Sequence, residues 1–127
     1  MVKTSLVSVD LERGREVLDA LDNAGIRVSV VLWAYLSEYE DWRLIFADPR
    51  LDAIGVKKAY KSLNDTVMAA GMRIEDKPLF MVLSMSDAFI KNLRRSFGHT
   101  RSVDGMRLGG QLIGDRFVED AYVYRIS

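Results

Sequence analysis

The segment formed by residues 27–36 is the strongest constraint on what this chain can fold into. It is rich in β-branched and aromatic residues, and successive side chains of a strand point to opposite faces of a sheet. Large apolar side chains occupy both sides, with Val28, Val30 and Leu32 on one and Val31, Trp33 and Tyr35 on the other. Such a segment is predicted to be a central strand, or a strand whose second face is covered.

Four further segments have the composition of strands. Residues 41–47 follow the polar stretch from Ser37, which indicates a hairpin with the first strand. Residues 79–84 resemble a short buried strand. Residues 106–113 and 116–126 flank a Gly-Asp turn and indicate a second hairpin. Within the first of these, Gly109-Gly110 predicts a bulge or a bend.

The first helix is predicted over residues 9–24. Its leucines recur at helical spacing, and Ser8 or Asp10 can cap its first turn. Gly25 is suited to end it in the left-handed region. Gly14 lies inside this helix and weakens it by about 1 kcal/mol relative to alanine.

Two more helices are predicted downstream. Asp48-Pro49 is typical of a cap followed by a first-turn proline, and we expect the helix that begins there to be irregular until Gly55. The apolar spacing that begins at Val56 is regular until Gly71. A third helix is predicted from a cap at Ser86 to Phe97.

The predicted order is therefore α-β-β-α-β-α-β-β, within one domain that spans residues 1–127. Its 127 residues are close to the usual size of a single domain. We expect an α+β fold with a mostly antiparallel sheet of about five strands and helices packed on it. The sequence does not determine the strand order.

Composition narrows the possible chemistry. The chain has no cysteine, which excludes a disulfide framework, a thiolate metal site and a cysteine nucleophile. Its single histidine excludes a multi-histidine metal centre within one chain. Neither an apolar signal segment nor a membrane span is indicated. We expect a reducing, cytoplasmic setting, and no pattern points to a cofactor, a bound metal or a catalytic set.

The most distinctive surface feature is a basic cluster on the third helix and the loop after it. Lys91, Arg94 and Arg95 stand at i, i+3 and i+4 and share one helix face. His99, Arg101 and Arg107 follow, with no acidic residue between Asp87 and Asp104. These side chains could bind phosphate or carboxylate groups. The simpler interpretation is the solvated face of an amphipathic helix, whose basic C-terminal turn complements the helix dipole.

A second basic run lies early in the second helix and contains Lys57, Lys58 and Lys61. If the second and third helices cover the same face of the sheet, the two runs could border one groove. Charge is unevenly spread along the chain, since residues 1–55 have a balance of −4 and residues 86–116 one of +3, while the net charge is zero.

Two features of the sequence could be interpreted as catalytic, the single histidine and an acidic triplet that ends in lysine. His99 could act as an acid or base from its loop. Glu75-Asp76-Lys77 resembles part of a restriction-type nuclease motif, but that chemistry needs the triplet on a strand, with another carboxylate nearby for magnesium.

Residues 20–35, 42–48 and 119–127 (ALDNAGIRVSVVLWAY, WRLIFAD and EDAYVYRIS) resemble a family of small uncharacterised bacterial proteins. The resemblance implies a bacterial, intracellular origin, and no activity or ligand comes with it.

The leading hypothesis is a non-enzymatic binding module that presents its basic helix and loop to an acidic protein or to nucleic acid. Exposed strand edges on a small sheet also favour a homodimer. The alternatives are a small metal-dependent nuclease-like or phosphate-processing enzyme, and a structural subunit of a larger assembly.

Overall fold

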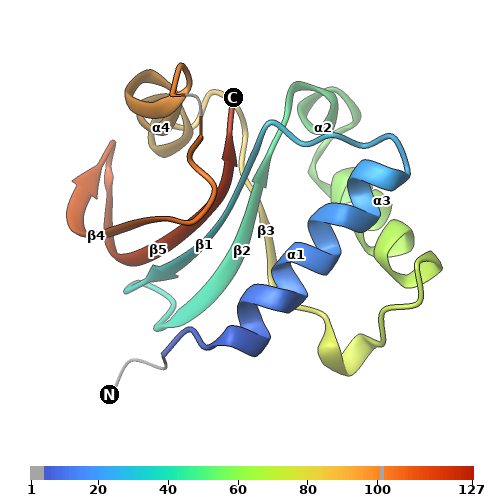
Figure 1. Cartoon of the computed structure of the whole chain (residues 1–127). Coiled ribbons are helices and arrows are strands. Elements are labelled where there is room, and N and C mark those ends of the chain that lie inside the picture. Colours follow the sequence, from blue (N-terminus) through green and yellow to red (C-terminus); the bar gives the residue numbers. More distant parts are fainter. Residues whose placement is uncertain (1–4, 101) are drawn as a thin grey trace.

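A computed structural model describes residues 5–100 and 102–127 (Figure 1). Its helices are α1 (Ser8–Asn23), α2 (Pro49–Ile54), α3 (Val56–Ala69), the short 3-10 helix η1 (Ile74–Asp76) and α4 (Ala88–Phe97). Its strands are β1 (Val30–Leu36), β2 (Asp41–Ala47), β3 (Phe80–Val82), β4 (Met106–Ile113) and β5 (Arg116–Ile126). Among the described residues the strands form one five-stranded sheet in the order β3-β2-β1-β5-β4.

The predicted α+β class and the predominantly antiparallel sheet are confirmed. β1 pairs antiparallel with β2 and with β5, and β4 pairs antiparallel with β5. β3 instead runs parallel to β2, so the sheet is mixed. A parallel neighbour needs a crossover connection, and α2 and α3 supply it between β2 and β3.

β1 is the central strand, and all seven of its residues are buried. Val30, Leu32 and Leu36 pack in one core with the apolar side of α4. Val31, Trp33 and Tyr35 pack in a second core with apolar residues of α1 and α3. The sheet therefore lies between α4 on one side and α1 and α3 on the other, as Figure 1 shows.

Several element boundaries differ from the prediction. β1 begins at Val30 and not at residue 27, and Val28 packs in the core of α1 and α3. The second helix is interrupted at Gly55, where φ is +86°, a left-handed value that favours glycine. α4 is capped by Asp87 and not by Ser86, since the Asp87 carboxylate accepts from the Phe89 amide at 2.9 Å.

The glycine pair in β4 makes a bend and not a bulge. The register of β4 against β5 is the same on both sides of Gly109-Gly110, and Gly110 has a φ of +60°. Register shifts occur instead between β1 and β5, between Val31 and Leu32 and between Tyr35 and Leu36.

Gly14 allows α1 to lie very close to the sheet. A Cβ atom at this position would stand 2.2 Å from the Tyr124 hydroxyl and 2.7 Å from Trp33 Nε1. The Tyr124 hydroxyl donates to the Leu11 carbonyl at 2.7 Å and accepts from Trp33 Nε1 at 3.1 Å. Burial raises the pKa of Tyr124 to about 12, so the hydroxyl stays protonated and able to donate. The residue that weakens the isolated helix is thus the one that the packing requires.

Among the described residues, none of the helices is both long and apolar enough to cross a membrane.

We predict that Gly14→Ala destabilises the protein, although alanine favours the helix by about 1 kcal/mol. Overpacking of a filled core costs about 1–3 kcal/mol, and the new methyl group would overlap two side chains. Urea unfolding followed by tryptophan fluorescence measures the loss. Repeating the substitution in a Tyr124→Phe background should reduce its cost, because the nearest atom is removed. An equal cost in both backgrounds would show that the hydroxyl contact is not the cause.

Candidate functional site

α4 presents its basic residues to solvent because its apolar residues hold it on the sheet. Phe89, Ile90 and Leu93 are completely buried under the helix. Lys91, Arg94 and Arg95 are exposed on the outer side. The spacing of three and four residues keeps these three cations on one face of the helix.

None of the three cations on α4 is paired with an aspartate or glutamate side chain among the described residues. Arg94 Nε donates to the backbone carbonyl of Ser127 at 2.9 Å. Arg95 reaches the Asn92 side-chain oxygen at 3.5 Å, which is a weak contact. Neither interaction involves an acidic side chain. We call Lys91, Arg94 and Arg95 the α4 cation face.

Most other cations of the described chain are matched by a carboxylate. Ion pairs are formed by Arg13, Arg15, Arg43, Arg50, Lys61, Arg73, Arg107, Arg116 and Arg125. The α4 cation face therefore differs from most of the surface in carrying three neighbouring cations that no acidic side chain balances. Lys57 and Lys58 of α3 are exposed as well and form no ion pair among the described residues.

The remaining residues of the predicted cluster are dispersed. His99 is exposed just beyond α4 and has no hydrogen-bond partner among the described residues. Arg107 lies on β4 and pairs with Asp120 at 2.8 Å, so its charge is already balanced. Arg101 lies outside the described residues.

The second basic run lies on the other side of the sheet. Lys57, Lys58 and Lys61 belong to α3, whose buried residues pack in the core shared with α1 and not in that of α4. The predicted shared groove depended on both helices covering the same face, and that condition is not met. Lys61 is also paired with Asp65 of its own helix.

A hollow of about 660 Å³ adjoins the α4 cation face and is lined in part by Lys91. It lies where β3 ends and α4 begins, with α2 on its other side. The side chains of Leu51, Val56, Val82 and Met85 make its wall mostly apolar. Ligands of sheets with parallel strands commonly bind beyond the carboxyl ends of those strands, and this hollow has that position.

Asp52 organises the polar part of the hollow. Its carboxylate accepts from the Met85 amide at 3.0 Å and from the Ser84 hydroxyl at 3.4 Å. The hydroxyl groups of Ser84 and Ser86 are 2.8 Å apart. These contacts hold the loop before α4 in place. The hollow therefore combines an apolar wall, two hydroxyl groups, the Asp52 carboxylate and the Lys91 ammonium group.

Sequence reasoning missed Asp52, Ser84 and Ser86 as members of a site. Ser84 and Ser86 carried a signal, because they stand between a buried strand and a helix start. Asp52 carried none, since its role depends on α2 packing beside the end of β3.

The nuclease-like triplet has a different arrangement from the one that its chemistry needs. Glu75 and Asp76 lie in η1 and not on a strand, and both form ion pairs with Arg73. The Lys77 ammonium stands 3.9 Å from the centre of the Phe80 ring, and burial lowers its pKa. Among the described residues, no group of three or more histidine, aspartate or glutamate side chains is placed to hold a metal ion.

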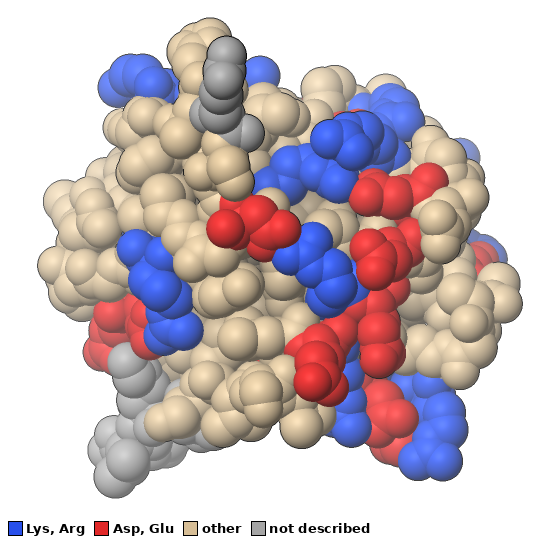
Figure 2. Space-filling model, viewed as in Figure 1, with Lys and Arg blue, Asp and Glu red and all other residues tan. Residues whose placement is uncertain are grey.

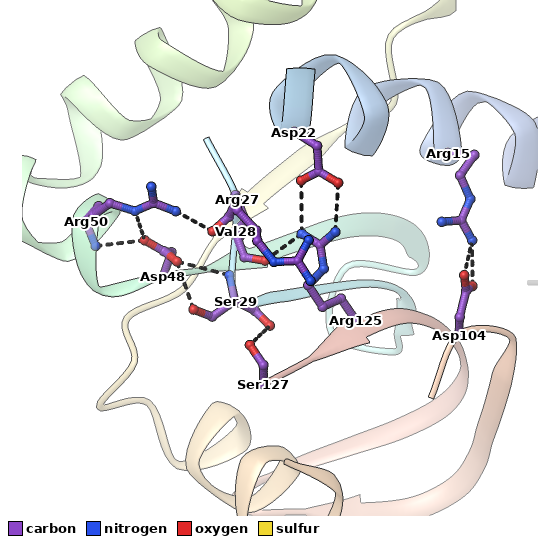
Figure 3. A network of polar contacts seen from close by, with 10 residues as sticks. All are labelled: Arg15, Asp22, Arg27, Val28, Ser29, Asp48, Arg50, Asp104, Arg125 and Ser127. Carbon is purple, nitrogen blue, oxygen red and sulfur yellow. Dashed lines mark hydrogen bonds and ion pairs between the residues drawn. The ribbon is translucent and has the colours of Figure 1, made fainter. Parts of the chain in front are cut away.

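The most buried carboxylate belongs to Asp48, which is 3% exposed. It accepts from the Ser29 hydroxyl at 2.8 Å and amide at 3.0 Å, and from the Arg50 amide at 2.9 Å and Nε at 3.0 Å. Burial alone would raise the pKa of Asp48, but the hydrogen bonds from Arg50 and Ser29 outweigh it and lower the pKa. Figure 3 shows this carboxylate between the start of β1 and α2. Its contacts are all used in holding the two segments together.

A neighbouring ion pair joins α1 to β5. Arg125 donates to both carboxylate oxygens of Asp22, at 3.1 and 2.8 Å, and to the Val28 carbonyl at 3.1 Å (Figure 3). Its hydrogen bonds hold the pKa of Asp22 below its usual range. This part of the network also fastens segments of the fold.

Comparison with known proteins gives no match among family models, curated proteins or solved structures. The resemblance to small bacterial proteins therefore stays a prediction, and function has to be argued from geometry.

We predict that Asp48→Asn lowers the free energy of unfolding at pH 7 by about 1–3 kcal/mol, because the charged acceptor of four hydrogen bonds is lost. The folded pKa lies below the unfolded value of about 3.9. The stabilisation by Asp48 is therefore complete above about pH 4 and is lost as the pH falls through the folded pKa.

Urea unfolding at pH 7 and pH 3 tests this, with Asp115→Asn on the exposed turn as control. The difference between wild type and Asp48→Asn should narrow at pH 3, while the control stays close to wild type at both. A difference that grew at low pH would contradict the assignment.

Proposed function

We propose that this chain is a non-enzymatic docking module that binds an acidic segment of a protein on the α4 cation face. The observation that carries the proposal is the set of adjacent charges on Lys91, Arg94 and Arg95, which no acidic side chain of the described chain balances. Positive groups without an internal partner are available to a partner's carboxylates, and such contacts steer association and set specificity.

The hollow beside Lys91 favours a protein partner over nucleic acid. Its wall contains Leu51, Met85 and Val56, and Val56 is 62% exposed. An apolar side chain of a bound segment would cover these residues while its acidic neighbours reach the cations. Nucleic-acid binding relies on many phosphate contacts, whereas this face has three cations on a chain of zero net charge.

A reducing, cytoplasmic setting is part of the proposal, and the absence of cysteine supports it. Self-association also belongs to the proposal, through a charged helix face or through the edge strand β4, on which Leu112 is 68% exposed.

Fluorescence anisotropy with a labelled peptide of alternating glutamate pairs and leucines tests the proposal. The variant Lys91→Glu/Arg95→Glu reverses two charges of the face. Arg94 is kept because it also bonds to the Ser127 carbonyl. Exposed ion pairs contribute about 0.2–1 kcal/mol each, and reversal adds repulsion. We therefore expect Kd to rise about tenfold or more, since about 1.4 kcal/mol corresponds to tenfold.

The matched control is Lys57→Glu/Lys58→Glu, which makes the same change in net charge on α3. It should leave peptide affinity within about twofold of wild type, because neither lysine lines the hollow or belongs to the α4 cation face. Equal losses in both variants would mean that only net charge matters. A labelled single-stranded DNA of similar length is measured in parallel. If the DNA bound more tightly than the peptide and the α4 variant lost that binding, nucleic acid and not an acidic protein would be the partner.

A further inference from the structure

The outer face of α1 carries the opposite charge to the α4 cation face. Glu12, Glu16 and Asp19 recur at i, i+4 and i+7 and are exposed, so they form one stripe along the helix. None of the three is in an ion pair among the described residues. The cations of the same helix are engaged elsewhere, because Arg13 pairs with Asp76 and Arg15 with Asp104. Figure 2 shows acidic side chains gathered along this helix.

The stripe borders a hollowed surface. Two depressions of about 310 and 350 Å³ lie along the seam between α1 and the chain that follows α3. Glu16 and Met72 line both of them. Val9, which is 47% exposed, adds an apolar side chain beside Glu12 in the first. This surface can therefore receive another element through apolar contact as well as charge.

The two charged faces cannot meet within one molecule. α1 packs in one core and α4 in the other, so the sheet separates them. Their charges are complementary, and the net charge of the chain is zero. We infer that the acidic segment bound by the α4 cation face is α1 of a second copy of this chain. This inference rests on the proposed function and names its partner.

The spacing of the charges suits two helices lying side by side. Lys91 and Arg95 are four residues apart, as are Glu12 and Glu16. Four residues advance a helix by about 6 Å, so two ion pairs can form together. The contact joins different surfaces of the two copies. Two copies joined in this way leave the α1 stripe of one copy and the α4 cation face of the other unused. Such a heterologous contact adds further copies, in a ring or an open chain, and does not stop at a symmetric dimer.

Sedimentation velocity of the intact chain tests the inference. At about 10 mM ionic strength the screening length is about 30 Å, and at about 1 M it is about 3 Å. We expect the average sedimentation coefficient to rise with protein concentration at low salt and to stay at the monomer value at high salt. Lys91→Glu/Arg95→Glu and Glu12→Lys/Glu16→Lys should each abolish the rise.

A four-site charge swap combines both pairs of substitutions in one chain and tests directly whether the two faces pair with each other. It restores complementary faces and the net charge of wild type, so concentration-dependent assembly should return. Lys57→Glu/Lys58→Glu and Asp115→Lys/Glu119→Lys change net charge by the same amounts on other surfaces and should assemble like wild type. Circular dichroism of each variant shows that a loss of assembly is not a loss of folding.

The outcomes separate this inference from the proposed function. A wild-type chain that stays monomeric at low salt, while the acidic peptide still binds α4, overturns self-docking alone. Assembly that survives both reversals is held by another surface, such as the β4 edge, and also overturns it. Failure of the four-site swap to assemble, with the fold intact, contradicts the pairing of these two helices. Loss of peptide binding to wild type would instead remove the proposed function.

Discussion

Burial of β1 on both of its faces is the constraint on which the rest of the structure depends. The strand lies between β2 and β5, and all seven of its residues are buried. Leaving one apolar face in water would cost on the order of 25 cal/mol for each Å². Both faces therefore need a helical layer, which α4 supplies on one side and α1 with α3 on the other. The separation of the acidic and basic helices by the sheet follows from this arrangement.

Charged residues serve two purposes in this chain. Pairs such as Asp22 with Arg125 and Asp104 with Arg15 join segments that are distant in sequence. Their charges are used within the fold, as are those of Asp48 and Arg50. The α4 cation face and the acidic stripe of α1 have no such internal partners. The proposal that these two surfaces bind a partner rests on this difference between balanced and unbalanced charges, more than on the number of basic residues.

Much of the fold could be predicted from sequence, but only part of the candidate site could. Helical spacing placed Lys91, Arg94 and Arg95 on one side of α4, because that relation is local. The same reasoning could not show that Arg107 is balanced by Asp120, or that the lysines of α3 lie across the sheet from α4. It also missed the hollow beside Lys91, since Asp52 and Ser84 come together only when α2 packs near the end of β3.

The sequence by itself determined the local structure: the helical and strand segments, most of their ends and the apolar character of both faces of β1, because side-chain periodicity and turn residues act over a few positions. Only the tertiary structure decided the parallel pairing of β3 and the partner of each charge. Gly14 shows the reason most clearly. Glycine at this position destabilises the isolated helix, but the folded protein needs it because the Tyr124 hydroxyl packs against it. Tyr124 lies over a hundred residues away in the sequence and comes close to Gly14 only when the sheet folds.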